Sequence, residues 1–267
     1  MKEQLLQKAK PIIFITEMVK AILDDRKNQT RRPIKIKNKL TRDWAITSGV
    51  EWLKVDLKDE KYPYSIREQN GAWNEYSLKD FINKYSQYKV GDILWVRESA
   101  KILSYVDCDA HFEIVYQFLS DGKIESLTHD DLINKYKLED HEFESKYLSK
   151  KYIEKLQKIP NGCLKEMARI FLKVTKVKIE RLQDISKEDS LKEIGKGSWL
   201  CELANMYPHY EDYTRGFNDI DYDLKGKNVN GAICSFRTLW NSTAKDGYKW
   251  EDNPFVFVYE FEKVEVC

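Results

Sequence analysis

The sequence feature that most constrains the fold is the C-terminal segment from Phe255 to Glu262. Aromatic residues occupy every second position, and valines stand between them: Phe255, Phe257, Tyr259 and Phe261 alternate with Val256 and Val258. A strand with one solvated face would instead alternate apolar with polar residues. We therefore expect this segment to be a central strand of a sheet that is covered on both faces.

Three further segments predict strands. Residues 91–97 read as a turn followed by a strand buried on both faces. Apolar residues alternate with polar ones over 112–118, as in a half-buried strand. Over 170–179 the alternation slips by one residue after position 174, which predicts a bulge or bend near Thr175.

Two helices are also expected. The apolar run Pro11–Ile15 predicts a strand, and helical spacing of apolar residues then begins at Thr16. We expect that helix to end near Lys27 or Asn28, because Pro33 cannot continue it. Further on, Ser186 followed by Asp189 is a capping-box variant that begins a short helix, with Ile185 before it and Gly195 to stop it.

The composition is that of a folded chain with almost no net charge. Its 267 residues hold 45 basic and 44 acidic side chains, for a net charge of +1, which excludes a polybasic tail binder and an acidic solvating chain. No apolar stretch approaches the roughly 20 residues of a membrane-spanning helix. The first residues lack the apolar core and cleavage site of a secretory signal, so we expect a cytoplasmic protein without membrane contact.

Metal and cofactor chemistry is not expected. The five cysteines form no Cys-x-x-Cys pair, and the four histidines form no His-x-x-x-His pattern. The cysteines therefore read as reduced structural thiols.

Polar stretches at about 38–88, 120–160 and 196–230 look like additions to the core. The window from Arg26 to Arg42 holds eight basic and no acidic residues, which predicts contact with phosphates. Trp44, Trp52 or Trp73 could then stack on bases. The alternatives are a solvated basic loop paired with the acidic residues of 211–223, and tryptophans that belong to the core.

Four segments in order resemble ASCH-domain proteins of the PUA-like superfamily, above all the large ASCH proteins carried by bacteriophages and prophages. They are Pro11–Arg32, Gly91–Glu98, Arg181–Ser186 and Trp250–Phe261. The resemblance implies an α+β fold, a PUA-like mixed β-barrel with flanking and inserted helices. It also implies a single domain over residues 1–267, with the three polar stretches as insertions.

Across this superfamily the barrel has a cleft for RNA, nucleosides or modified bases, and a small bacterial branch hydrolyses the amide of N4-acetylcytidine with a Lys, a Thr and a Glu. The resemblance assigns these catalytic roles to Lys27, Thr30 and Glu193. A threonine hydroxyl needs a base to accept its proton, and a lysine is that base when burial or nearby cations lower its pKa. A carboxylic acid can protonate the leaving amine.

We expect four arginines to contact phosphate or ribose, with one glutamate at the barrel mouth: Arg26, Arg31, Arg32, Arg97 and Glu98. Two alternatives stay open. Lys27 and Thr30 also suit an ordinary helix end and the turn after it. Arg97 and Glu98 also suit a surface ion pair of little energetic weight.

The sequence thus predicts recognition of a nucleoside, nucleotide or single-stranded RNA in a PUA-like cleft, with amide hydrolysis of an acylated cytidine as a candidate reaction. The alternative is a non-catalytic phage accessory protein that binds RNA or sequesters a nucleotide signal of host defence. A partner in virion assembly is a third class. The identity of the ligand and the oligomeric state stay open.

Overall fold

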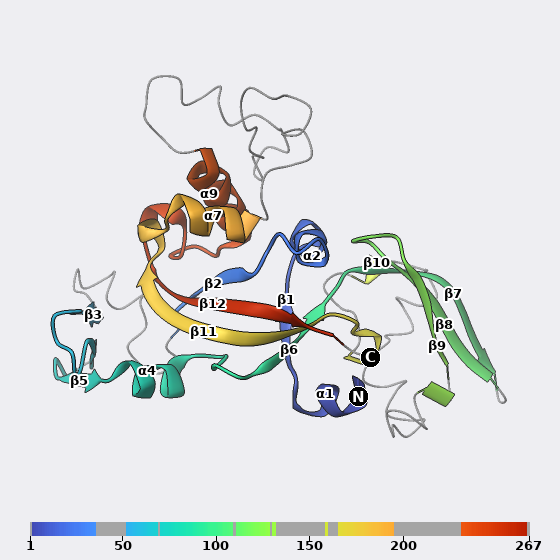
Figure 1. The fold of residues 1–267 in the computed structure, drawn as a ribbon, viewed down its shortest axis with the longest axis horizontal. Coiled ribbons are helices and arrows are strands. Elements are labelled where there is room, and N and C mark those ends of the chain that lie inside the picture. The colour runs from blue at the N-terminus through green and yellow to red at the C-terminus, as the bar shows by residue number, and fades with distance from the viewer. Residues whose placement is uncertain are drawn as a thin grey trace. The chain divides into compact units, whose positions relative to one another are not determined.

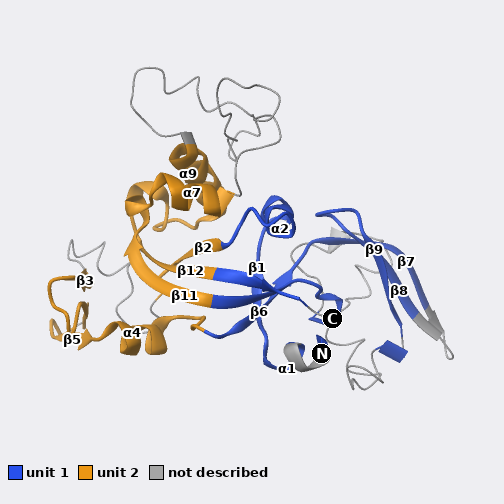
Figure 2. Ribbon diagram, viewed as in Figure 1, with its two compact units in different colours: residues 1–28, 91–174, 261–267 blue, residues 29–90, 175–260 orange. Residues whose placement is uncertain are grey.

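The computed structural model confirms the α+β class and divides the chain into two compact units (Figures 1 and 2). It describes residues 2–35, 52–68, 70–108, 111–128, 130–131, 158–159, 165–194 and 231–265. Unit 1 comprises residues 1–28, 91–174 and 261–267, and unit 2 comprises residues 29–90 and 175–260. The strands of the described parts form three open sheets.

In unit 1, strand β1 (Lys10–Ile13) pairs in parallel with β6 (Ile93–Arg97), which pairs antiparallel with the beginning of β11 (Phe171–Arg181). The middle three residues of β6 are buried, which confirms the strand predicted to be covered on both faces. Helix α1 (Lys2–Lys8) packs Leu6 against Trp95 and Phe171 of this sheet.

The second sheet of unit 1 has the order β10–β7–β8–β9. Its strands are Lys158–Ile159, Ala100–Cys108, His111–Phe118 and Ile124–Thr128, and the 3-10 turn η2 (Lys165–Met167) leads into β11. Ile114, Tyr116 and Phe118 are buried while the residues between them are partly exposed, as the alternation predicts.

In unit 2, strand β12 (Phe255–Val264) pairs antiparallel with β2 (Gln29–Pro33). The order of the largest sheet is β1–β6–β11–β12–β2, so β12 is a central strand, as predicted. Helices α7 (Lys187–Ile194) and α9 (Gly231–Thr243) lie side by side (Figure 1), and short turns η3 (Leu182–Asp184) and η4 (Trp250–Asp252) precede α7 and β12.

Unit 2 also holds a small antiparallel sheet with the order β3–β4–β5, formed by Leu53–Val55, Tyr64–Arg67 and Trp73–Tyr76. Helix α4 (Leu78–Tyr85) follows it, with Ser77 as its N-cap. Phe81 of α4 is fully buried between the ring of Tyr64 in β4 and that of Phe257 in β12. This helix therefore joins the small sheet to the central strand.

Helix α2 (Thr16–Leu23) ends earlier than the sequence predicts. Asp25 takes a left-handed backbone conformation (φ 57°), and its N–H and that of Arg26 donate to the carbonyls of Ile22 and Ala21. This is a Schellman-type helix end with Asp in the position usually held by Gly. The helix stops because these bonds close it, several residues before Pro33 could act, so Lys27 lies in the connection to β2.

Two local predictions are confirmed. Ser186 Oγ accepts a hydrogen bond from the Asp189 N–H at 3.0 Å and caps α7, with Ile185 buried before it. In β11 the burial pattern slips after Val174, and Val177 is the next buried residue. The boundary between the two units falls at the same place, between residues 174 and 175.

The division into two compact units does not test the prediction of a single domain over residues 1–267, which stays a prediction. The insertion expected at 38–88 contains β3, β4, β5 and α4. The stretch 196–230, with the acidic residues of 211–223, lies outside the described residues, as do most of 120–160 and the basic window beyond Lys35. No described helix has the length and apolar character to cross a membrane.

Candidate functional site

The most concentrated polar site of unit 2 surrounds Arg31 in strand β2. Its side chain is fully buried, and the guanidinium donates to Glu180 of β11 at 2.6 and 2.8 Å, through Nη2 and Nε. Nη1 donates to Glu193 Oε1 at 3.1 Å, and Nη2 donates to Asp189 Oδ2 at 3.3 Å, both in α7. The ring of Phe236 in α9 covers it at 5.9 Å.

The charges of this Arg31 cluster balance. Lys178 lies 3.2 Å from Asp189 and 3.5 Å from Glu180, and Lys192 lies 3.2 Å from Asp189. Three cations therefore face three carboxylates. Burial lowers the pKa of Arg31, but the charges of Glu193 and Glu180 outweigh it, so the net pKa is raised.

Arg32 lies next along β2, and because side chains alternate across a strand it points to the other face. It pairs in register with Phe257, and Thr30 pairs with Tyr259. On this face the Tyr259 hydroxyl hydrogen-bonds Ser86 at 2.8 Å, and its ring meets that of Tyr88 edge-on at 5.2 Å. Thr30 and Arg32 thus share a face lined by aromatic residues.

The electrostatic environment of Arg32 differs from that of Arg31. Burial lowers its pKa, and opposing influences of Tyr88, Glu193 and Tyr259 leave the net pKa below the ordinary value. Burial also raises the pKa of Tyr259, so this hydroxyl is uncharged at neutral pH. Glu193 is then the carboxylate that acts on both arginines. Arg32 is partly exposed to solvent.

The three residues assigned to catalysis are all buried: Lys27 is 4% exposed, Thr30 2% and Glu193 3%. Thr30 and Glu193 both belong to unit 2, whereas Lys27 belongs to unit 1, where its Nζ lies 5.7 Å from the centre of the Phe14 ring. Glu193 Oε1 accepts a hydrogen bond from Arg31. The catalytic assignment stays a prediction.

Glu98 is fully buried in unit 1, in a different network. Arg169 donates to both of its oxygens, at 3.0 Å from Nε and 2.8 Å from Nη2, and Ser120 Oγ donates to it at 2.9 Å. Arg169 also donates to Asp121 at 2.7 Å and lies over the Phe118 ring at 3.9 Å. The partner of Glu98 is therefore Arg169, and the alternative of a surface ion pair with Arg97 is wrong because Glu98 is completely covered.

The other two predicted ligand-binding residues lie in unit 1 as well. Arg26 donates to Asp24 Oδ2 at 2.8 and 3.2 Å across the turn after α2. Arg97 ends β6 and is partly exposed, and within the described residues its buried Nε has no acceptor. Ligand contact by either residue stays a prediction.

Sequence reasoning missed the partners that complete both networks. Glu180, Arg169 and Asp121 stand in no motif, and their roles appear only in the contacts that the fold makes between segments distant in sequence. Asp189 was recognised only for its place in the capping box. In the part of the chain that the structure describes, no three His, Cys, Asp or Glu side chains lie together as a metal site requires. Comparison with known proteins found no matching family model, no similar curated protein and no similar solved structure.

Proposed function

We propose that this protein recognises a nucleoside, nucleotide or single-stranded RNA, with Arg32 of unit 2 as the contact for a phosphate. One observation carries the proposal: Arg31 and Arg32, neighbours on β2, differ in exposure and in the face on which they lie. The Arg31 side chain is fully buried among three carboxylates, whereas Arg32 is partly exposed on the opposite face. A guanidinium that solvent reaches can donate charge-assisted hydrogen bonds to a phosphate.

The aromatic residues of the Arg32 face hold its surroundings in place. Tyr88 and Tyr259 are buried there, and Ser86 Oγ bonds both the Tyr88 carbonyl and the Tyr259 hydroxyl. The nucleotide is therefore expected to meet this face through its phosphate and the Arg32 guanidinium. The finer fold, a PUA-like mixed barrel with its cleft, and the phage type of the protein belong to the same proposal.

The test is nucleotide binding to the full chain by calorimetry, with cytidine 5′-monophosphate as the probe. Arg32→Met should weaken binding about 10- to 100-fold, because a charge-assisted hydrogen bond is lost. Arg237→Met is the matched control, since Arg237 is a half-exposed arginine of unit 2 paired with Glu251. Equal affinities of the Arg32 variant and the unsubstituted chain would contradict the proposal.

Amide hydrolysis is the second candidate, and the burial of Lys27 favours it, because a lysine shielded from water is the form that proteins use as a base. Incubation with N4-acetylcytidine should then release cytidine and acetate. Thr30→Val keeps the shape of the side chain and removes the hydroxyl, and it should abolish release. Binding without any product would retire the hydrolase and leave the binding protein.

A further inference from the structure

The small sheet of unit 2 has two different faces. Leu53 pairs with Ile66, and Tyr64 pairs with Tyr76, so these residues share one face. Leu53, Tyr64 and Ile66 are buried, and the rings of Tyr64 and Tyr76 pack on Phe81 of α4. This face is the core of the sheet, and it fixes the three strands to the rest of unit 2.

The opposite face presents a row of three side chains: one from β4, one from β5 and one from the residue that precedes β3. Arg67 in β4 pairs with Trp73 in β5, and its N–H donates to the carbonyl of Trp52, the residue before β3. Trp52 alternates with the buried Leu53 and therefore belongs to the outer face. The row Trp52–Arg67–Trp73 thus places an arginine between two tryptophans.

The side chains of this row are open to solvent to different degrees. Trp73 is 41% exposed, a large fraction for an indole ring, and Trp52 and Arg67 are partly exposed. The Arg67 guanidinium lies 6.0 Å from the centre of the Trp73 ring, within cation–π range. Among the described residues nothing accepts a hydrogen bond from Arg67 Nε. The row offers two aromatic surfaces with a hydrogen-bond donor between them.

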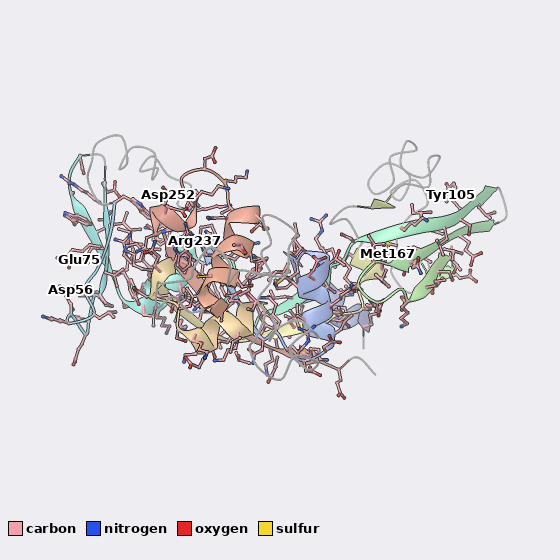
Figure 3. All side chains as sticks on the ribbon, turned by 90° about the horizontal axis from the view of Figure 1, so that it is seen from above. Asp56, Glu75, Tyr105, Met167, Arg237 and Asp252 are labelled. Atoms are coloured by element: carbon pink, nitrogen blue, oxygen red, sulfur yellow. The ribbon has the colours of Figure 1, made fainter. Side chains whose placement is uncertain are left out.

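Charges of both signs lie on the outer face, but the row itself carries one, the Arg67 cation. Lys54 belongs to the same face, and Glu75 stands opposite Ser65, beyond the Arg67–Trp73 pair. Figure 3 labels Glu75 on β5 and Asp56 just after β3. Since neighbouring strands lie about 4.8 Å apart, the backbones of the two tryptophans are roughly 10 Å apart, with Arg67 between them.

We propose that the Trp52–Arg67–Trp73 row is a stacking platform for single-stranded RNA. The proposal rests on the proposed function and deepens it, because it names an RNA strand as the ligand of this sheet, beside the nucleotide contact at Arg32. Base stacking on aromatic side chains tolerates any sequence, and an arginine between the rings supplies contact with the backbone. A flat aromatic row of this kind is a surface for extended strands and not for a mononucleotide.

The experiment compares two probes on the full chain: a fluorescein-labelled oligocytidylate of about twelve nucleotides, followed by fluorescence anisotropy, and cytidine 5′-monophosphate. Trp73→Ala should weaken oligonucleotide binding about 5- to 150-fold and leave mononucleotide binding unchanged. Trp73→Phe should retain most of the oligonucleotide affinity. Tyr62→Ala is the matched control, because Tyr62 is 38% exposed below Lys61 but stands outside the row.

The possible outcomes separate this inference from the proposed function. Nucleotide binding at Arg32, with oligonucleotide affinity that Trp73→Ala does not change, would overturn the platform and leave the function standing. Oligonucleotide binding that depends on Trp73, without any mononucleotide binding, would support the platform and contradict the Arg32 site. Binding of neither probe would overturn both. A DNA oligonucleotide of the same sequence serves as a further probe. If it binds more tightly than the RNA oligonucleotide, the assignment to RNA is overturned.

Discussion

In each unit an arginine lies among carboxylates, but the two networks are built differently. In unit 1, the partly exposed Arg169 donates two hydrogen bonds to the fully buried Glu98 and also binds Asp121. In unit 2, Arg31 is the fully buried member, and Glu180 and Asp189 among its three carboxylates are partly exposed, with Lys178 and Lys192 near them. The fully buried charge is thus an anion in the first network and a cation in the second.

This difference bears on function, because a buried ion pair is a poor place for a ligand. Removing one member of such a pair leaves the other uncompensated. The sequence assigned Glu98 and Arg31 to ligand contact. In the structure Glu98 accepts a hydrogen bond from Arg169, and Arg31 donates one to Glu193. Arg32, by contrast, is partly exposed to solvent.

The largest expected effect tests the unit 1 network. Arg169→Met leaves Glu98 buried without its cation, so the free energy of unfolding should fall by about 3–5 kcal/mol in chemical denaturation. The pair replacement Arg169→Met with Glu98→Gln removes the charge as well and should recover much of that loss. If the single and the double variant are equally unstable, the loss is one of packing and not of charge.

A somewhat smaller loss, about 3 kcal/mol, is expected for Arg31→Met, because Lys178 still lies beside Glu180 and Asp189. The neighbouring substitution Arg32→Met should lower the unfolding free energy less than Arg31→Met does and should weaken nucleotide binding. A large loss of stability in the Arg31 variant, together with a loss of nucleotide binding in the Arg32 variant, would sharpen the contrast between the two arginines. Should Arg32→Met destabilise as much as Arg31→Met, Arg32 is a structural residue.

The pH dependence of stability should show both networks. Burial raises the pKa of Asp189, but hydrogen bonds from Lys178 and Lys192 outweigh it, and the net pKa is lowered. Arg169 lowers the pKa of Asp121. A carboxyl with a lowered folded-state pKa stabilises the fold above its ordinary value of 3.8, and this contribution is lost as the pH falls through the folded-state pKa.

Stability measured between pH 7 and pH 2 should therefore fall below about pH 4. Asp189→Asn should flatten part of that fall, and Asp121→Asn another part. Glu251 has a lowered pKa too but belongs to neither network, so Glu251→Gln is the control for a carboxyl outside them. An acid transition that neither Asp variant alters would show that these networks do not govern it.

The smallest expected effect comes from the cap that positions α7. Ser186→Ala removes the hydroxyl that accepts the Asp189 N–H and should cost about 1 kcal/mol of unfolding free energy. Because α7 carries Asp189 and Glu193, the same variant tests whether the Arg31 cluster depends on the start of this helix. Ser186→Asp restores an acceptor and should recover the lost unfolding free energy. If this variant recovers neither the stability nor nucleotide binding, the Arg31 cluster does not depend on the cap.

Local features of this protein could be read from the sequence because they depend on nearby residues. The alternation in β12, the Ser186 cap and the slip after Val174 were all predicted and are all present. The end of α2 was predicted too late, because an Asp in a left-handed conformation carries no sequence signal as clear as Gly. The candidate site was read only in part: Arg32 was among the expected residues, but nothing distinguished it from Arg31.

The sequence by itself determined the α+β class, the central aromatic strand and the basic residues of β2. Only the tertiary structure decided which charge is compensated, because the partners of Arg31 and Arg169 come from segments more than 40 residues distant along the chain, up to 162 residues away for Glu193. The same holds for the Trp52–Arg67–Trp73 row, which exists because the pairing of β4 with β3 and with β5 brings residues of separate segments side by side. Periodicity specifies the face on which a side chain lies, and burial and pairing specify what that side chain can still bind.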